Sequence, residues 1–154
     1  MKRIAMAFLI AASLPVAAEE CPRIPKAIET AIAEHIEGLR ATEYCEARTV
    51  KSDGKLSVVI YTAEGACGSD SKEEPGTCSS SWFRFMVGER NGKIIGPEQI
   101  GGKFDFSDRK IRISGNVVEI SGLTLGDKDA FCCPTVPASR KYNVSKDGFE
   151  EISP

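Results

Sequence analysis

The chain has 154 residues, 42% of them hydrophobic, and a formal net charge of −2, which suits one ordinary globular domain. Its 20 lysines and arginines form no basic stripe, which argues against a nucleic-acid partner, because such a partner requires phosphate neutralisation. No apolar run reaches membrane-spanning length, so the sequence predicts no transmembrane segment.

The first 18 residues have the pattern of a secretory signal peptide. Two basic residues precede an apolar run (residues 4–14), and Val16 and Ala18 supply the small residues of a cleavage site before Glu19. Cleavage there removes two basic residues and changes the formal net charge from −2 to −4. We therefore expect an exported protein, periplasmic or secreted, with one mature domain spanning residues 19–154.

A helix is predicted shortly after this segment. Pro25 is tolerated in the first helical turn, where its missing N–H costs no hydrogen bond. We expect the helix to run from about Pro25 to Leu39 and to lay one face on an apolar surface. That face is marked by isoleucines at every fourth position, namely Ile24, Ile28, Ile32 and Ile36.

The chain from about Tyr44 onward alternates between β-rich runs and short turns. The run in residues 55–62 is apolar on both faces, as expected for a central strand covered by the helix. Gly101-Gly102 indicates a bulge or a tight bend. We therefore predict an α+β fold, in which one N-terminal helix packs on an antiparallel β meander that disulfides staple. Four dipeptides predict hairpin turns, namely Asp53-Gly54, Asn91-Gly92, Gly115-Asn116 and Asp147-Gly148.

All six cysteines lie in the expected mature part, and an even number of cysteines in a small exported domain indicates disulfides. Cys67 and Cys78 bracket a loop rich in glycine, serine and charged residues. We expect these two to pair, because the bond closes a short, solvated loop.

The remaining four cysteines leave alternatives open. Cys21 precedes the helix and Cys45 follows it, on flanks that a helix of about 22 Å separates. Neighbouring side chains of an extended strand point to opposite faces, and Pro134 favours extended backbone at Cys133. Separate bonds from Cys132 and Cys133 to Cys21 and Cys45 are therefore favoured. A Cys132–Cys133 bond together with Cys21–Cys45 is the alternative and would make a candidate thiol-redox site. A metal site is disfavoured, because the adjacent pair lacks C-x-x-C spacing.

No catalytic motif stands out, and we predict no cofactor. His35, the only histidine, lies at the edge of the helix's apolar face and is expected to be structural; no G-x-S-x-G elbow accompanies it. No phosphate loop or dinucleotide fingerprint is present. An envelope hydrolase that uses carboxylates stays an alternative, and it requires a raised pKa at Asp127 or Asp129. Asp105 and Asp108 are further candidates for such a pair.

One predicted strand carries residue types that anchor interfaces. Strand alternation places Trp82, Arg84 and Met86 on one face, and Trp and Arg are enriched at the energetic centres of interfaces. This face either packs under the helix or a loop, or forms an outward patch that contacts another envelope protein. The leading hypothesis is a non-enzymatic binding or structural protein, of the inhibitor or immunity type.

Three segments, GGKFDF, DAFCCPT and RKYNV, resemble a loose grouping of small exported bacterial proteins, most of which are uncharacterised. Members combine an N-terminal helix and a run of strands with a Gly-Gly-Lys element and a D-x-x-CCP segment before a strand containing a tyrosine. The resemblance implies a Gram-negative periplasm and carries over no catalytic residue. Its elements fall here on Gly101, Gly102, Lys103, Asp129, Cys132, Cys133, Pro134 and Tyr142.

Overall fold

The computed structural model describes residues 20–65, 82–130 and 133–152. The expected signal peptide and the expected Cys67–Cys78 pair lie outside these residues. In the described part, no helix is both long and apolar enough to cross a membrane. Its elements are the helices α1 (Lys26–Leu39) and η1 (Cys45–Ala47) and the strands β1 (Thr49–Ser52), β2 (Leu56–Glu64), β3 (Trp82–Arg90), β4 (Lys93–Gly102), β5 (Phe106–Ser114), β6 (Val117–Thr124), β7 (Val136–Val144) and β8 (Phe149–Ile152).

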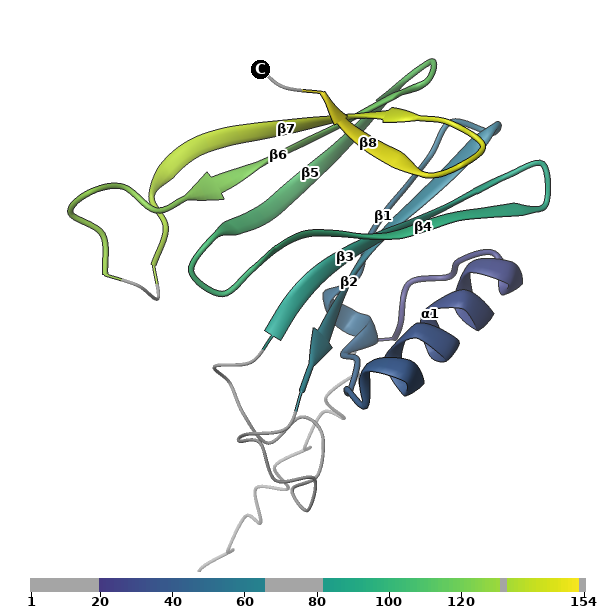
Figure 1. Ribbon diagram of the computed structural model, residues 1–154, viewed down its shortest axis with the longest axis horizontal. Coiled ribbons are helices and arrows are strands. Elements are labelled where there is room, and N and C mark those ends of the chain that lie inside the picture. Colours follow the sequence, from purple (N-terminus) through teal and green to yellow (C-terminus); the bar gives the residue numbers. More distant parts are fainter. Residues whose placement is uncertain (1–19, 66–81, 131–132, 153–154) are drawn as a thin grey trace, which may run out of the picture.

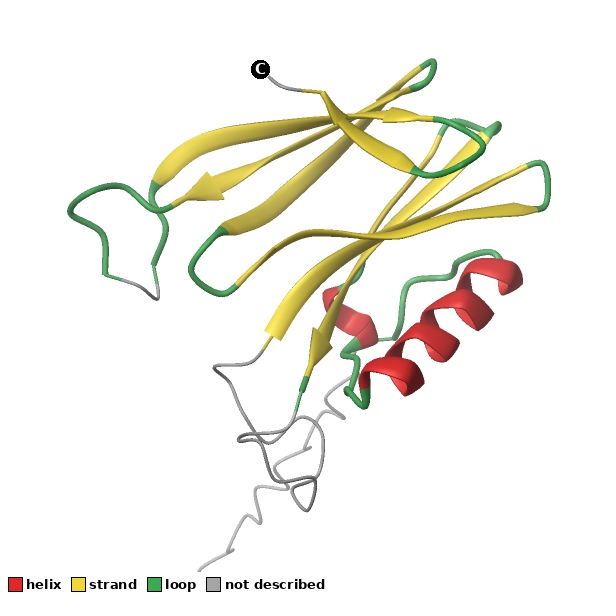
Figure 2. Cartoon of the chain, viewed as in Figure 1, coloured by secondary structure: helices red, strands yellow, loops and turns green. Residues whose placement is uncertain are grey.

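These strands form two four-stranded antiparallel sheets that face each other (Figure 1). The first has the order β1-β2-β3-β4 and the second the order β5-β6-β7-β8. Strands make up far more of the described chain than helices do (Figure 2). The predicted α+β fold, one helix on a β meander, is therefore wrong. The protein is mainly antiparallel β, and each half of the meander forms its own sheet.

The width of a sheet explains this division. Eight strands side by side at about 4.8 Å would form a sheet about 38 Å wide. A single helix is only about 10–12 Å across and would leave most of that sheet's apolar face in water. Folding the second sheet against the first buries the apolar faces of both.

Apolar side chains from both sheets form the inner core. The helix covers the opposite face of the first sheet (Figure 1), where Ile28 and Ile32 contact Tyr61 and Phe85. The predictions that the isoleucine face packs on a sheet and that β2 is buried on both faces are thus confirmed. The inner core comprises Leu56, Val58, Ile60, Met86, Ile95 and Ile100 from the first sheet, and Phe106, Ile111, Val118, Ile120, Tyr142, Val144 and Phe149 from the second.

The predicted turns lie where the dipeptides indicated, each between two consecutive strands. Asn91 and Gly92 have φ angles of 53° and 77°, as a type I′ hairpin turn requires. The strand register shifts between β3 and β4 beside Gly101, so the predicted bulge is confirmed. A Cβ atom at Gly101 would collide with the backbone of Phe106, so the glycine permits β5 to start close to β4 as the chain changes sheets.

Candidate binding groove

One face of β3 runs from the core to the surface. Met86 is fully buried, Arg84 is 8% exposed and Trp82 is partly exposed. The three share a face as predicted, but this face lies toward the second sheet. Of the two alternatives for this face, the covered one holds for Met86 and Arg84, although the second sheet rather than the helix or a loop covers them; among the three, only Trp82 reaches the surface. The first half of the chain gives no sign that a second sheet will cover this face.

Trp82 borders an open groove of about 470 Å³ between the ends of the two sheets. A smaller hollow of about 70 Å³ adjoins it and shares Trp82 and Ser107, and Phe104 and Lys103 also line this hollow. The single tryptophan of the chain thus stands between two depressions of one surface. The larger groove is lined by Tyr44, Ala47, Thr49, Thr62, Glu64, Trp82, Arg84, Ser107 and Asp108.

The floor of the groove is a buried ion pair. Arg84 Nε donates to Asp108 Oδ1 at 2.6 Å, and Arg84 Nη2 donates to Asp108 Oδ2 at 2.9 Å. Arg84 Nη1 donates to the Thr62 hydroxyl and to the Ala47 carbonyl oxygen, and the Thr49 hydroxyl donates to Asp108 Oδ2. These contacts satisfy most of the polar atoms of both side chains, so the floor is a neutral, rigid network rather than a reactive group.

The rim of the groove combines two aromatic rings with a carboxylate. Glu64 and Trp82 are direct cross-strand partners at the ends of β2 and β3, which places their side chains next to each other on the groove side. Backbone hydrogen bonds between Thr42 and Glu64 bring the segment before η1 alongside β2. A hydrogen bond to the Glu64 carboxylate raises the pKa of the Tyr44 hydroxyl. Tyr44 itself is 44% exposed.

Two of the other candidate carboxylates, Asp105 and Asp129, have structural partners. Asp105 pairs with Arg140 at 2.7 Å in the second sheet. Asp129 accepts hydrogen bonds from the Gly126 N–H and from the N–H and hydroxyl of Thr135. These bonds, that from Gly126 foremost, lower the pKa of Asp129. A lowered pKa is the opposite of what the hydrolase hypothesis requires at this residue.

His35, predicted at the edge of the helix's apolar face, lies between the helix and the first sheet. Its Nδ1 is 2.7 Å from the Tyr61 hydroxyl, and its ring meets the edge of Phe85 at a centroid distance of 4.6 Å. Burial lowers the pKa of His35 and raises the pKa of Tyr61. Both ring contacts fit a histidine held neutral in a packing role.

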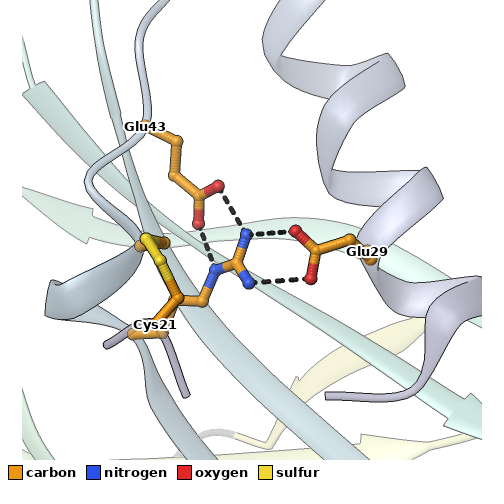
Figure 3. Close-up of a disulfide and its surroundings, with 5 residues drawn as sticks. Cys21, Glu29 and Glu43 are labelled. Carbon is orange, nitrogen blue, oxygen red and sulfur yellow. Dashed lines mark hydrogen bonds and ion pairs between the residues drawn. A yellow bond between two sulfur atoms is a disulfide. The ribbon is translucent and has the colours of Figure 1, made fainter. Parts of the chain in front are cut away.

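The structure joins Cys21 to Cys45 (Figure 3), with the two Cα atoms 5.1 Å apart. The favoured prediction, separate bonds from Cys132 and Cys133 to these two cysteines, is therefore wrong. The chain after α1 turns back along the helix, so that Cys45 returns to the segment before it. Cys133 is in a disulfide whose partner lies outside the described residues, as Cys132 itself does.

A two-carboxylate clamp stands beside this disulfide. The Arg48 guanidinium donates to Glu29 of α1 and to Glu43 of the following segment, each through two hydrogen bonds of 2.6–2.9 Å (Figure 3). The two carboxylates raise the pKa of Arg48, and its hydrogen bonds lower the pKa of Glu29. The clamp and the disulfide together fix the helix to the start of the first sheet.

One group of possible metal ligands comes together in the described residues, and it includes this disulfide. Its members are Cys21, Cys45 and Glu46. A metal ion needs thiolate sulfur, and these two sulfurs are bonded to each other. The group does not fit a metal site.

In comparisons with known proteins, no protein-family model, curated protein or solved structure matches this chain.

Sequence reasoning found Trp82 but missed its neighbours Glu64 and Tyr44. The alternation of β2 places Glu64 on the same face as Thr62, and the sequence alone could have predicted this position. The pairing of Glu64 with Trp82 cannot be predicted from the sequence, because residues 65–81 separate β2 from β3 and no two-residue turn fixes the register.

Proposed function

We propose that this protein is a non-enzymatic binding protein of the bacterial envelope, of the inhibitor or immunity type. It occupies a site on a partner protein through the groove bordered by Trp82. The observation that carries this proposal is the position of Trp82, which stands partly exposed between two adjoining depressions.

The composition of this surface supports binding rather than chemistry. Interface centres are enriched in Trp, Tyr and Arg, and rigid aromatic side chains lose little conformational entropy when they bind. Trp82, Tyr44 and Phe104 border the two depressions, and the ion pair of Arg84 and Asp108 forms a rigid floor. A preorganised floor lowers the ordering cost of association.

Export to the periplasm is part of the proposal. It is supported by the signal-peptide pattern that ends at Ala18 and by the Cys21–Cys45 disulfide. Disulfides persist in oxidising compartments and are rare in the bacterial cytosol. N-terminal sequencing of the exported protein should find Glu19 as the first residue; retention of Met1 would contradict export by cleavage.

Affinity capture from a Gram-negative periplasmic extract tests the binding role. The wild-type protein should retain a specific partner, and Trp82→Ala should weaken the affinity for it at least about fivefold, since aromatic anchors often contribute more than 1 kcal/mol. Circular dichroism should show both proteins folded.

Phe83→Ala is the matched control. Phe83 is the next residue of β3, an aromatic side chain 44% exposed on the opposite face of the sheet. Its loss should leave capture unchanged. Equal capture by wild type and Trp82→Ala, or equal loss in both variants, would reject the groove as the binding surface.

A further inference from the structure

We infer that the groove receives a positively charged side chain, arginine or lysine, presented by a basic partner protein. This inference rests on the proposed function, because it names the chemistry of the partner that the groove binds. It follows from the charges and the aromatic rings at the rim.

The described residues that line the groove carry a net negative formal charge. Among them Arg84 is the one cation, and Asp108 neutralises it through two hydrogen bonds. Glu64 is the other charged residue in this described lining and contributes one unit of negative charge. The Glu64 carboxylate would repel an anionic ligand, and the Arg84 guanidinium already donates hydrogen bonds to Asp108.

Glu64 has room for a second donor. An ionised carboxylate offers about four acceptor positions, and interaction with the Tyr44 hydroxyl uses at most one of them. A guanidinium or ammonium group can therefore donate a hydrogen bond to a remaining acceptor position of the Glu64 carboxylate.

Two aromatic residues, Trp82 and Tyr44, line the same groove as this acceptor. Trp82 is the cross-strand neighbour of Glu64, and both aromatic residues line the same groove. The face of a tryptophan ring attracts a cation, and arginine is the side chain most often found there. A groove that combines a carboxylate with aromatic rings thus suits a cationic side chain better than a neutral or anionic one.

The charge of the whole chain favours the same partner. The formal net charge is −2, and it becomes −4 if the expected signal peptide is removed. An acidic protein attracts a basic partner over long range, which raises the association rate and selects against acidic partners. The groove then supplies the local contact for one projecting side chain.

Fluorescence of the single tryptophan tests the inference, because Trp82 reports directly on the groove. A hexa-arginine peptide should change the emission in a saturable way that weakens with added salt, and a hexa-glutamate peptide should not. Glu64→Gln should weaken the binding of hexa-arginine about threefold to fivefold, as loss of one exposed charge pair does.

Glu150→Gln is the matched control, because it removes the same charge from an exposed position on β8 in the other sheet. It should bind hexa-arginine as the wild type does. Equal binding by Glu64→Gln and Glu150→Gln, or an emission change with hexa-glutamate, would overturn the inference. If the inference is overturned but the captured partner still changes Trp82 emission, the proposed function stands without the inference. If neither the peptides nor the partner changes the emission, the inference and the proposed function both fail.

Discussion

Arg84 of β3 and Asp108 of β5 form an ion pair that joins the two sheets at the end of their shared core. Their side chains are 10% and 2% exposed, and two parallel hydrogen bonds connect them. Water is therefore largely excluded from both charges. The strength of the pair depends on each charge keeping its partner.

Removing one of these charges should be strongly destabilising. Asp108→Asn leaves the Arg84 cation buried without a counter-charge and should lower the free energy of unfolding by about 3–5 kcal/mol. Urea denaturation followed by circular dichroism measures this. The double variant Arg84→Met/Asp108→Leu should lose less than the sum of the two single changes. A loss below about 1 kcal/mol for Asp108→Asn would show that the pair is not buried in solution.

The two carboxylates that hold Arg48 should differ in importance. The side chain of Glu43 is 13% exposed and that of Glu29 is 54% exposed, whereas the side chain of Arg48 is 3% exposed. Glu43→Gln should therefore cost about 1.5–3 kcal/mol, as loss of a buried charged hydrogen-bond partner does. Glu29→Gln should cost less than about 1 kcal/mol, because water screens that pair. Thermal denaturation of both variants checks the order, and a larger effect at Glu29 would contradict it.

His35 predicts a pH dependence of stability. Burial lowers its pKa in the folded protein below the usual 6.5, so the unfolded chain binds the proton more readily. The stability that the neutral ring provides is complete above about pH 6.5 and is lost as the pH falls through the folded pKa. His35→Gln should flatten this part of the stability profile. Denaturant midpoints measured across this pH range test it, and an identical slope in wild type and variant would refute the assignment.

The Cys21–Cys45 disulfide should contribute strongly to stability. The two cysteines lie 24 residues apart in the sequence, and closing a loop of this length stabilises a chain by about 3–4 kcal/mol in the entropy model. The double variant Cys21→Ser/Cys45→Ser should lose about this amount in urea. Peptide mass mapping of the intact protein should recover a Cys21–Cys45 linked peptide. A peptide that links Cys45 to Cys132 or Cys133 instead would contradict the structure.

Local patterns in the sequence predicted local structure well. The helix, the four hairpin dipeptides and the two-sided burial of β2 each depend on residues close together in the chain, and each is confirmed. The shared face of Trp82, Arg84 and Met86 follows from strand alternation in the same way. Alternation fixes which side chains share a face, but it does not say what lies opposite that face.

The errors all concern contacts between distant parts of the chain. Arg84 and Asp108 are 24 positions apart and lie in different sheets, so no periodicity connects them. The pairing of Cys21 with Cys45 depends on the chain turning back after α1. The left-handed residue at this turn is Arg40 rather than the glycine that commonly marks a helix end, so the sequence did not indicate the turn. The sequence indicated a second sheet only indirectly. A single sheet of all the strands would be wider than one helix can cover.

The central claim is that Trp82 lies at the contact with a partner protein. Its most direct test is the emission of Trp82 when the purified captured partner is added to the full-length mature protein, using a partner variant or labelling scheme that separates the two signals. We predict a saturable shift in Trp82 emission, with Phe83→Ala behaving as the wild type. Saturable binding that leaves the emission of Trp82 unchanged would contradict the account.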